Sequence, residues 1–481
     1  MSSVALWWIR RDLRLTDNAA LAAALRHAHQ IIPVFILDPI AHHGHSVSQR
    51  RLAFLYEALR SLDSALRKRG SRLVVRYGKP DDLIPALVRE SGATAVFAEE
   101  DYSPYARQRD ARVAKHVPLH LTPGVVIHPP ETVRTADDKP YTVFTPFARA
   151  WRALPSPSRS ALLPPPTHLP PVPDEITGDP IPTIAGFDWS HFPPSEQAAQ
   201  ERLEHFCHGD EAPIFRYHHE RNWLDGRGSS RLSPYFRFGL LSARSAFVTA
   251  MEARAKAKTE EAKRGVDAWI NELIWREFYV NILAHFPHVV KQNFRQVYNN
   301  FPWENDSTLF AAWREGMTGY PVVDAAMRQL REEGWISNRA RMIVASFLVK
   351  DLLVHWRWGE RWFWEQLIDG DPAANNGGWQ WTAGTGTDAA PFFRIFHPVK
   401  QGEQFDPDGR YVRRWVPALA HVPDHFIHHP WDMPADLQRK TGCRIGDTYP
   451  APLVDHEQAR QRALRLLQQL HRDKQKRAKE R

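Results

Sequence analysis

Short apolar segments alternate with helical patterns over the first 100 residues, and this alternation restricts the fold more than any other feature. The segments VALWWIR, QIIPVFILD, SRLVVRYG and ATAVFAEE have the length and the β-branched or aromatic content of strands. Between them lie DNAALAAALRHAH, RRLAFLYEALRSLDSALRKRG with its final Gly70, and PDDLIPALVRESG, which carry helix-spaced apolar residues. The pattern predicts a doubly wound parallel sheet, whose ligands lie beyond the carboxyl ends of the strands.

Phosphate-binding glycine motifs are missing from this α/β part. Neither GxGxxG nor GxxxxGK with a following Ser or Thr comes after any of the four expected strands. These motifs bring backbone N–H groups close to the phosphates of dinucleotides and of nucleoside triphosphates. The sheet is therefore not expected to form an ordinary dinucleotide site or a P-loop.

A proline-dense segment from Trp151 to Phe187 separates the two halves of the chain. Proline is excluded from helix interiors and from central strands, so the segment is expected to be an extended connector. Beyond it the pattern is almost wholly helical, as in VDAWINELIWREFYVNILAHF, NRARMIVASFLVKDLLVHW and the basic C-terminal segment. We therefore expect an α/β domain over 1–135, a connector over 136–195 and an all-α domain over 196–481.

Composition narrows the class of partner. The formal net charge of +8 favours a polyanion, usually nucleic acid, although a basic surface without a specific partner is the alternative. Two cysteines, Cys207 and Cys443, are too few for a disulfide framework or a zinc ribbon, and AHHGH at 41–45 is interpreted as a polar loop, so no metal site is expected. No apolar run has membrane-spanning length, and arginines follow the first apolar segment, which is the reverse of a secretory signal; a cytoplasmic protein is expected.

The segment NNGGWQW, residues 375–381, combines turn-forming residues with two tryptophans. Asn-Asn-Gly-Gly is typical of a solvated turn, whereas paired tryptophans indicate buried surface. Either a turn is pinned onto a core, or flexible backbone approaches a flat ligand.

The segment WINELIWREFY carries polar and aromatic residues on one helical face. Trp269, Glu272, Arg276 and Tyr279 follow at steps of three and four, with Trp275 beside them. Such a face suits a cavity wall with an aromatic plate, and the alternative is an amphipathic helix with a partly buried ion pair.

Two further segments carry candidate ligand groups. In GSSRLSPYFRFG, Ser229, Ser230 and Ser233 are expected to cap the following helix and could offer hydroxyl and N–H groups to a phosphate. In SNRARMIV, Arg341 lies on an apolar helix and needs a carboxylate partner, for which Asp369 is the candidate.

Together these motifs resemble the DNA photolyase/cryptochrome family over nearly the whole chain. The segments that carry the resemblance are WWIRRDLRLTDN, SSRLSPYFRFG, NELIWREFY, WREGMTGYPVVDAAMRQL, GWISNRARMIVASFLVKDLL and DGDPAANNGGWQWTAGTGTDAAPFFRIFHP. The resemblance implies an N-terminal α/β domain and a helical domain that holds a U-shaped FAD. Within the family, the chain is most similar to the class I cyclobutane pyrimidine dimer photolyases. The resemblance implies a carbon–carbon lyase in which reduced FAD gives an electron under light to a dimer in UV-damaged DNA.

The resemblance also implies a FAD site. Its residues would be Tyr217, Ser229, Ser230, Arg231, Leu232, Ser233, Trp269, Arg276, Arg341, Asp369, Gly370, Asp371 and Asn375. Arg341 and Asp369 would form an ion pair against the flavin, Asp371 would lie near its pyrimidine edge, and Asn375 would face its reactive central nitrogen. Asparagine at 375 favours a repair enzyme, because plant cryptochromes usually carry Asp there and insect ones Cys.

The implied lesion pocket contains Glu272, Trp275, Asn338 and Met342, and Asn375 completes the catalytic set. A flat indole can pack on one pyrimidine ring of the dimer, Glu272 can hydrogen-bond the lesion, and Met342 gives adaptable apolar contact. Arg221 and Arg339 would lie near the DNA backbone. Glu272, Trp275 and Asn338 would also bind the DNA, at the lesion itself. A (6–4) photolyase would need two histidines where Asn338 and Met342 stand, and a signalling cryptochrome is the alternative from another class.

The late tryptophans divide by expected role. Trp379, Trp356 and Trp303 match the family's electron-transfer chain, which reduces oxidised flavin under light and is separate from the repair step. Trp381 and Trp358 are side branches or core, and packing in the core is the favoured interpretation.

A second, antenna chromophore is expected in the α/β domain. The folate-binding branch has an Asn-Glu pair where this chain has Tyr105 and Ala106, although Lys291 matches that branch. A deazaflavin or FMN, contacted by Arg51, Asp101 and Arg237, is therefore favoured over methenyltetrahydrofolate. The protein is expected to act as a monomer.

Overall fold

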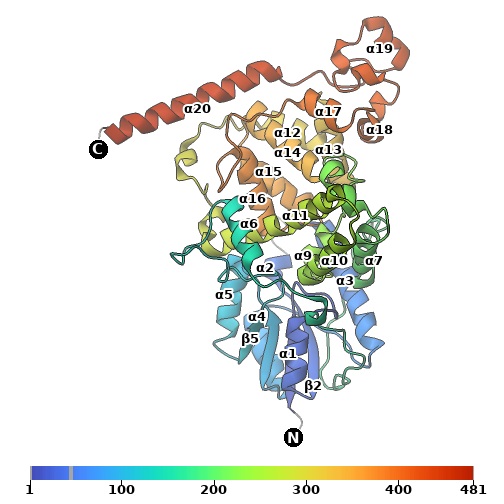
Figure 1. The fold of residues 1–481 in the computed structure, drawn as a ribbon, viewed down its shortest axis with the longest axis vertical. Helices are drawn as coiled ribbons and strands as arrows, with labels where there is room; N and C mark the ends of the chain where they lie inside the picture. The colour runs from blue at the N-terminus through green and yellow to red at the C-terminus, as the bar shows by residue number, and fades with distance from the viewer. Residues whose placement is uncertain (1–2, 43–46, 480–481) are drawn as a thin grey trace. The chain divides into compact units, whose positions relative to one another are not determined.

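The computed structural model describes residues 3–42 and 47–479, which form two compact units (Figure 1). The first unit contains Met1–His218, Ser230–Pro287 and Ile368–Ala373, and the second contains His219–Ser229, His288–Leu367 and Ala374–Arg481. Both predicted domain boundaries, after residues 135 and 195, fall inside the first unit. Those boundaries therefore stay a prediction.

A five-stranded parallel sheet lies in the first unit, with strand order β3-β2-β1-β4-β5. The strands are β1 Val4–Ile9, β2 Gln30–Leu37, β3 Val74–Tyr77, β4 Ala95–Glu99 and β5 Leu119–Thr122. Residues 5–9 of β1 are all buried, as expected for a central strand covered on both faces. The predicted doubly wound sheet and its first four strands are confirmed.

The helices between the strands follow the predicted pattern, with two additions. They are α1 Ala19–His27, α2 Pro39–His42, α3 Gln49–Arg67, α4 Pro80–Ser91 and α5 Pro104–Val113, of which α2 and α5 were not predicted. Helix α4 ends at Gly92, which has a left-handed φ of 67° that glycine adopts without strain. Residues 43–46, which include most of the histidine-rich loop at 41–45, lie outside the described residues.

The proline-dense connector is extended and follows the α/β part. After α6 Phe144–Ala153 its only regular element among the described residues is the short η1 Arg159–Ala161. Leu169 N donates to Arg69 O at 2.8 Å and Asp179 N to Val75 O at 2.7 Å, which ties the connector to the sheet side of the first unit. The segment is extended as predicted, whereas its role as a connector between two domains stays a prediction.

The rest of the first unit is helical. Its elements are α7 Glu196–Cys207, η2 Pro213–Arg216, α8 Tyr217–Glu220, α9 Ser233–Phe238, α10 Ala243–Lys256 and α11 Glu260–His285, with α8 extending to the first residues of the second unit. Helix α11 begins after Thr259, whose side chain accepts from Ala262 N. Buried Glu277 accepts hydrogen bonds from Ile127 N, from His128 N at 3.2 Å and from Trp151 Nε1 at 2.6 Å. Glu277 thereby fixes α11, which carries several predicted site residues, to the segments around residues 127–128 and 151.

The second unit is helical and has a tryptophan-rich core. Its elements are η3 Pro287–Val290, η4 Gln296–Asn300, α12 Ser307–Glu315, α13 Pro321–Glu333, α14 Asn338–Ser346, the π-helix η5 Phe347–Asp351, α15 Trp356–Gln366, α16 Pro372–Ala383, α17 Pro398–Phe405, α18 Arg410–Trp415, η6 Pro417–Leu419, η7 Asp424–Phe426, η8 Pro430–Asp432, α19 Ala435–Thr441 and α20 His456–Lys479. Trp313 and Trp356 are fully buried in this core.

Two local predictions for the second unit are wrong. The pattern over 338–356 predicts one helix, but α14 passes into the π-helix η5, and Leu353 has a left-handed φ of 51°. Lys350 and Asp351 are buried there. Lys350 Nζ donates to Ala383 O at 3.1 Å, and Asp351 Oδ1 is bonded to His456 Nδ1. The turn-like NNGGWQW is in fact part of helix α16, because packing of the two tryptophans and hydrogen bonds of the asparagines override the low helix propensity of glycine.

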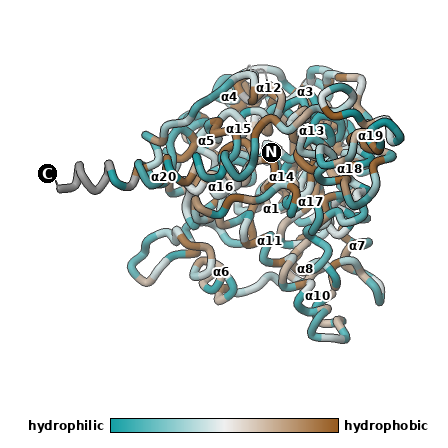
Figure 2. Tube along the Cα trace, turned by 90° about the horizontal axis from the view of Figure 1, so that it is seen from above, coloured by the Kyte–Doolittle hydropathy of each residue, from teal (hydrophilic) through white to brown (hydrophobic). Residues whose placement is uncertain are grey.

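The described part of α20 is mostly hydrophilic, as Figure 2 shows by the teal colour of its trace. Two of its apolar residues, Ala463 and Leu467, are buried in a small cluster with Tyr298 and Phe301 of the second unit, and Leu466 and Leu470 pack against that cluster. Within residues 3–42 and 47–479, every helix is too short or too polar to cross a lipid bilayer.

Candidate active site

A buried ion cluster forms where β1 ends in the first unit. Arg11, two residues beyond β1, donates from Nη2 to Asp371 Oδ2 at 2.6 Å, and its Nη1 lies 3.6 Å from Asp101 Oδ2. Asp371 Oδ1 accepts from Ala373 N at 2.9 Å, so the same carboxylate also caps the first turn of α16. Arg237 Nε donates to Gly370 O at 2.6 Å. The cluster thus fixes the segment 368–373, which sequence similarity assigns to the flavin.

Buried positive charge exceeds its compensation in this cluster. Burial and the neighbouring guanidinium of Arg237 lower the pKa of Arg51 to about 9, and burial together with Arg11 lowers the pKa of Arg237 to about 10. Burial also lowers the pKa of Arg276, and its Nη1 has no hydrogen-bond partner among the described residues. An anionic group placed here would be stabilised, which fits a phosphorylated or otherwise anionic cofactor.

Residues predicted for two different chromophores meet in this cluster. Arg51, Asp101 and Arg237 were assigned to the antenna, and Arg276 and Asp371 to FAD. Asp101 is engaged by Arg11, which outweighs the effect of burial and holds the pKa of that carboxyl below its usual value. The cavity beside Asp101 and Asp371 has a volume of about 10 Å³, which is room for about one water molecule and not for a chromophore.

The predicted ribityl and phosphate residues surround the start of α9. Trp269 Nε1 donates to Ser230 Oγ at 3.2 Å, so two of the predicted FAD residues are brought together. Phe206 packs on both Trp269 and Tyr217, with ring centroids 5.7 Å and 6.0 Å away.

The predicted serine cap of α9 is wrong. The N-cap residue is Leu232, no side chain caps the helix, and Arg231 before it has a left-handed φ of 51°.

The predicted lesion residues of α11 lie on its half-buried face. Glu272 and Trp275 are both partly exposed. The indole of Trp275 is stacked on Phe144 of α6, with ring centroids 3.7 Å apart and planes 5° apart. This stacking holds the indole plane in one orientation.

The predicted DNA contacts of the second unit also cluster. Asn338 is exposed at the first turn of α14, and Met342 follows one turn later. Arg339 donates from Nη2 to Asn222 Oδ1 at 2.9 Å, and its guanidinium carbon lies 4.4 Å from the ring centroid of Phe405. Burial lowers the pKa of Arg339, and the charge of nearby Arg221 lowers it further. Two predicted phosphate contacts are thus close enough to repel each other.

A polar network surrounds Asn375 on α16. Asn375 Nδ2 donates to Glu360 O at 3.0 Å, and the neighbouring Asn376 donates to Glu360 Oε1 at 2.8 Å and to Val289 O at 3.1 Å. Gln380, one turn further on, donates to Asn376 Oδ1 at 3.0 Å. Burial raises the pKa of Glu360 to about 7.

Gly378, three residues after Asn375, has open space beside it. A Cβ added at Gly378 would meet no heavy atom within 4 Å, so the chain's own packing does not require glycine there. Open space of this kind beside Asn375 fits a flat cofactor, as the sequence predicts for this segment.

The three tryptophans predicted for electron transfer lie in one aromatic region of the second unit. Trp379 is buried against Phe363 and Trp313, with centroid distances of 5.0 Å and 6.2 Å. The ring of His355 lies between the other two, 5.3 Å from Trp303 and 5.7 Å from Trp356.

The positions of the other two tryptophans differ from each other. Trp358 packs against the main core of the second unit, whereas Trp381 is half-buried. Their assignment to packing stays a prediction.

Several predicted site residues belong to different units, so the complete site stays a prediction. The first unit holds Arg51, Asp101, Tyr217, Ser230, Arg231, Leu232, Ser233, Arg237, Trp269, Glu272, Trp275, Arg276, Asp369, Gly370 and Asp371. The second holds Arg221, Ser229, Trp303, Asn338, Arg339, Arg341, Met342, Trp356, Asn375 and Trp379. The proposed pair of Arg341 with Asp369 joins one residue from each set.

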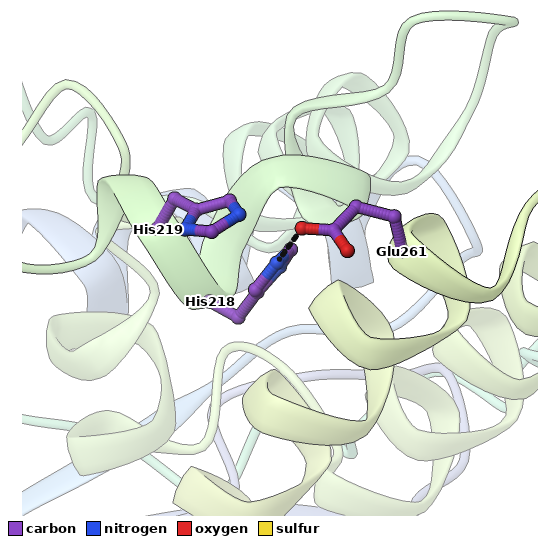
Figure 3. A group of neighbouring side chains, drawn as sticks. All are labelled: His218, His219 and Glu261. Carbon is purple, nitrogen blue, oxygen red and sulfur yellow. Dashed lines mark hydrogen bonds and ion pairs between the residues drawn. The ribbon is translucent and has the colours of Figure 1, made fainter.

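A histidine and a glutamate pair on the surface of the first unit. His218 Nε2 of α8 lies 2.6 Å from Glu261 Oε1 of α11 (Figure 3). The glutamate side chain is half exposed, and an ordinary hydrogen bond accounts for the contact.

Sequence reasoning missed Arg11, Glu360 and Asn376. Arg11 follows the carboxyl end of a central strand, and the rule that ligands lie beyond such strand ends could have found it. Asn376 and Gln380 are four residues apart and share a helix face, but the spacing has meaning only once the segment is known to be helical.

A parallel α/β part followed by helices, with paired charges around residues 368–373 and a cluster of tryptophans, fits the class of flavoproteins that the sequence predicts. Family models match residues 5–171 as "DNA photolyase" and 269–469 as "FAD binding domain of DNA photolyase". The deoxyribodipyrimidine photo-lyase of Synechococcus sp. is 41% identical over 95% of this chain and 94% of its own length.

Solved structures agree with the family models. A bacterial class III photolyase from Agrobacterium tumefaciens matches with a TM-score of 0.90, 36% identity and coverage of 98% of each chain. A cryptochrome from Synechocystis sp. matches with a TM-score of 0.87, 32% identity and coverage of 96% of this chain and 99% of its own. The chain belongs to the DNA photolyase family. It is a light-dependent DNA-repair enzyme that binds FAD, as the sequence predicts.

Proposed function

We propose that the chain splits cyclobutane pyrimidine dimers in UV-damaged DNA. The observation that carries the proposal is the joint presence of Glu272, Trp275, Asn338, Met342 and Asn375 in a chain of this family. When bound, reduced and excited by light, FAD supplies the electron that opens the cyclobutane ring. No net oxidation results, because the electron returns after the ring has opened.

The chain's own residues would hold the cofactor and the lesion. The buried guanidinium of Arg276 suits an anionic cofactor, and the open space at Gly378 suits its ring. Asn375, oriented by its bond to Glu360 O, would offer its remaining amide groups to the ring.

Three side chains would hold the lesion: the flat indole of Trp275, the carboxyl of Glu272 and the apolar side chain of Met342. The indole of Trp275, held flat by Phe144, would pack on one pyrimidine, and Glu272 on the same helix would hydrogen-bond the other. Met342 would adapt to the saturated ring. A dimer leaves the stack at lower cost than a normal base pair, which favours its extrusion into such a pocket.

Arg221 and Arg339 would bind phosphates beside the lesion. Their mutual repulsion in the free protein would be relieved by a phosphate between them. Binding should therefore weaken steeply with salt concentration.

Further proposals concern the second chromophore, the oligomeric state and the location in the cell. A deazaflavin or FMN is favoured for the antenna, because Arg51 and Arg237 offer incompletely compensated positive charge to an anionic chromophore. We also infer a cytoplasmic monomer, which light scattering of the purified protein would check.

The test is repair in solution. Fully reduced protein is mixed with an oligonucleotide that contains one thymine dimer and is illuminated with near-ultraviolet or blue light. Intact thymines should reappear on chromatography, but not in the dark and not with an oligonucleotide that carries a (6–4) photoproduct. A light-driven flavin spectrum without any repair would contradict the proposal and favour a signalling cryptochrome.

A further inference from the structure

A cavity of about 460 Å³ opens in the second unit between α12, α15 and the segment before each helix. Its volume lies within the range of about 300–1,000 Å³ that small-molecule sites usually have. None of the residues predicted for FAD, the lesion or the antenna lines it.

Aromatic rings and a guanidinium form one wall of this cavity. The guanidinium carbon of Arg314 lies 5.2 Å from the ring centroid of Phe310 and 5.1 Å from that of Trp362, so the cation lies against two π faces. Trp358 meets Phe310 edge-on at 5.2 Å and adds a third ring. A planar heteroaromatic ligand would find stacking surfaces here.

Two donors at this wall are buried without hydrogen-bond partners among the described residues. They are Trp362 Nε1 and Arg314 Nε. A buried donor without a partner is destabilising, and an acceptor on a bound ligand would satisfy it.

The residues that line the cavity carry an excess of positive charge, and the nearby carboxyl of Glu360 interacts with Arg357 and Arg361. Arg314, Arg357 and Arg361 line it against one carboxylate, Glu365. Burial raises the pKa of Glu365, although Arg361 and Arg314 oppose the shift. Arg357 is held by the carbonyls of Lys291 and Val290, the latter at 3.0 Å. Arg357 is thereby fixed, and Arg361 lies one turn further along the same helix.

A neutral histidine completes the polar side. His355 Nδ1 accepts from Arg357 N at 3.1 Å, which places the proton of the neutral ring on Nε2. Burial and the charge of Arg357 lower the pKa of His355 to about 4, so the ring is neutral at physiological pH and Nε2 is a donor. Asn305 Oδ1 accepts from His355 N at 2.8 Å and fixes the backbone there.

We propose that this cavity binds a mononucleotide-sized planar aromatic anion, with its ring against Trp358 and Trp362 and its phosphate on Arg361 and Arg314. Stacking on indole and charge-assisted bonds to phosphate are the two interactions that nucleotides use most. The size of the cavity favours a free nucleotide, and a terminal nucleotide of DNA offers the same chemistry. The inference does not depend on the dimer-splitting activity.

The probe is AMP, added to FAD-loaded, full-length protein so that the flavin site is filled. Calorimetry should show saturable binding, with adenosine and ribose 5-phosphate each at least about tenfold weaker because each lacks one of the two interactions. Excess undamaged single-stranded oligonucleotide with a 5′-phosphate tests the other source. If it displaces AMP, the site takes DNA ends, and if it does not, the site takes free nucleotides.

Variants locate the binding. R361Q and W358A should each weaken AMP binding about tenfold or more, whereas R410Q, which removes a guanidinium from exposed α18, should have no effect. A second measurement needs no variant: AMP should protect Arg361 of the wild-type protein from phenylglyoxal, as mapped by mass spectrometry. Absence of AMP binding at millimolar concentration, or equal binding by all variants without protection of Arg361, would overturn the proposal.

Discussion

The ion cluster of the first unit and the tryptophan region of the second unit place buried polar groups in opposite ways. In the cluster, Arg11 is paired with two carboxylates, and Asp371 is bonded to both a guanidinium and a backbone N–H. In the tryptophan region, the indole N–H groups of Trp303 and Trp379 are buried without a partner among the described residues. One region is held by charge, whereas in the other the indole N–H groups either lack a partner or donate to uncharged oxygens, as Trp356 does to Asn293 Oδ1 and Trp313 to Val344 O.

The difference fits the roles that are proposed for the two regions. A segment that must hold a cofactor is positioned by ion pairs whose geometry is directional and strong when buried. A fixed charge beside a tryptophan would change the energy of its radical cation by several kcal/mol at the dielectric constant of a protein interior. Aromatic neighbours such as Phe363 and Trp313 pack Trp379 without adding such a charge.

The largest effect is expected from breaking the ion cluster with Asp371→Ala. The change leaves Arg11 with only the longer contact to Asp101 and removes the cap of α16. Losing one partner of a buried pair costs about 3–5 kcal/mol, so urea unfolding should show a loss of that size and FAD should be retained poorly.

The matched control is Asp408→Ala, whose contact with Arg410 at 3.5 Å is exposed. It should hardly change the free energy of unfolding, because exposed pairs contribute little. Equal losses in the two variants would show that the cluster of the first unit is not what holds the segment.

A smaller effect is expected in the tryptophan region from Trp379→Phe. The indole N–H has no partner to lose, and the ring edge lies on Gly359, where any Cβ would collide with Trp379 at 2.1 Å. The fold should therefore be kept, while photoreduction of oxidised flavin slows at least about tenfold and repair by pre-reduced enzyme continues.

Absorption spectroscopy under blue light measures photoreduction, and the repair assay supplies the second readout. Trp381→Phe is the control and should reduce the flavin at the rate of the wild type. Loss of repair by pre-reduced Trp379→Phe protein would contradict a role confined to photoreduction.

How far the sequence predicts the fold depends on how local the signal is. Three of the first four strands were predicted because each is an apolar run that is buried in the sheet, and β3 was predicted from its two buried valines and the apolar residue before them. Strand β5, Leu119–Thr122, escaped because LHLT lies at the sheet edge, where its side chains are partly or fully exposed and the apolar signal is weak.

The site was predicted mainly by resemblance, and its contacts could not be predicted from spacing. Arg11 and Asp371 are 360 residues apart, and only the fold brings them together. The segment of α16 was predicted as a turn, because glycine has a low helix propensity. The network of Glu360 with Asn376 was missed for the same reason.

The smallest effect is expected from Glu360→Gln, which tests whether the second unit tolerates a buried charge next to Asn375. The pKa of Glu360 is raised from 4.5 to about 7, so its contribution to stability is fully present below about pH 4.5 and is lost as the pH rises through about 7. Above that pH the wild type must bury a carboxylate, whereas Glu360→Gln stays neutral and keeps an oxygen that can accept from Asn376.

The variant should therefore match the wild type near pH 5 and exceed its free energy of unfolding by about 1–2 kcal/mol near pH 8, a value reduced for partial solvent access. Urea unfolding at both pH values measures the difference, and Glu315→Gln, a change on an exposed helix end, should show no such pH dependence. A variant that loses stability at pH 8 would mean that Glu360 is stabilised as the anion. The second unit would then compensate buried charge as the first unit does, and the contrast between the two regions would not hold.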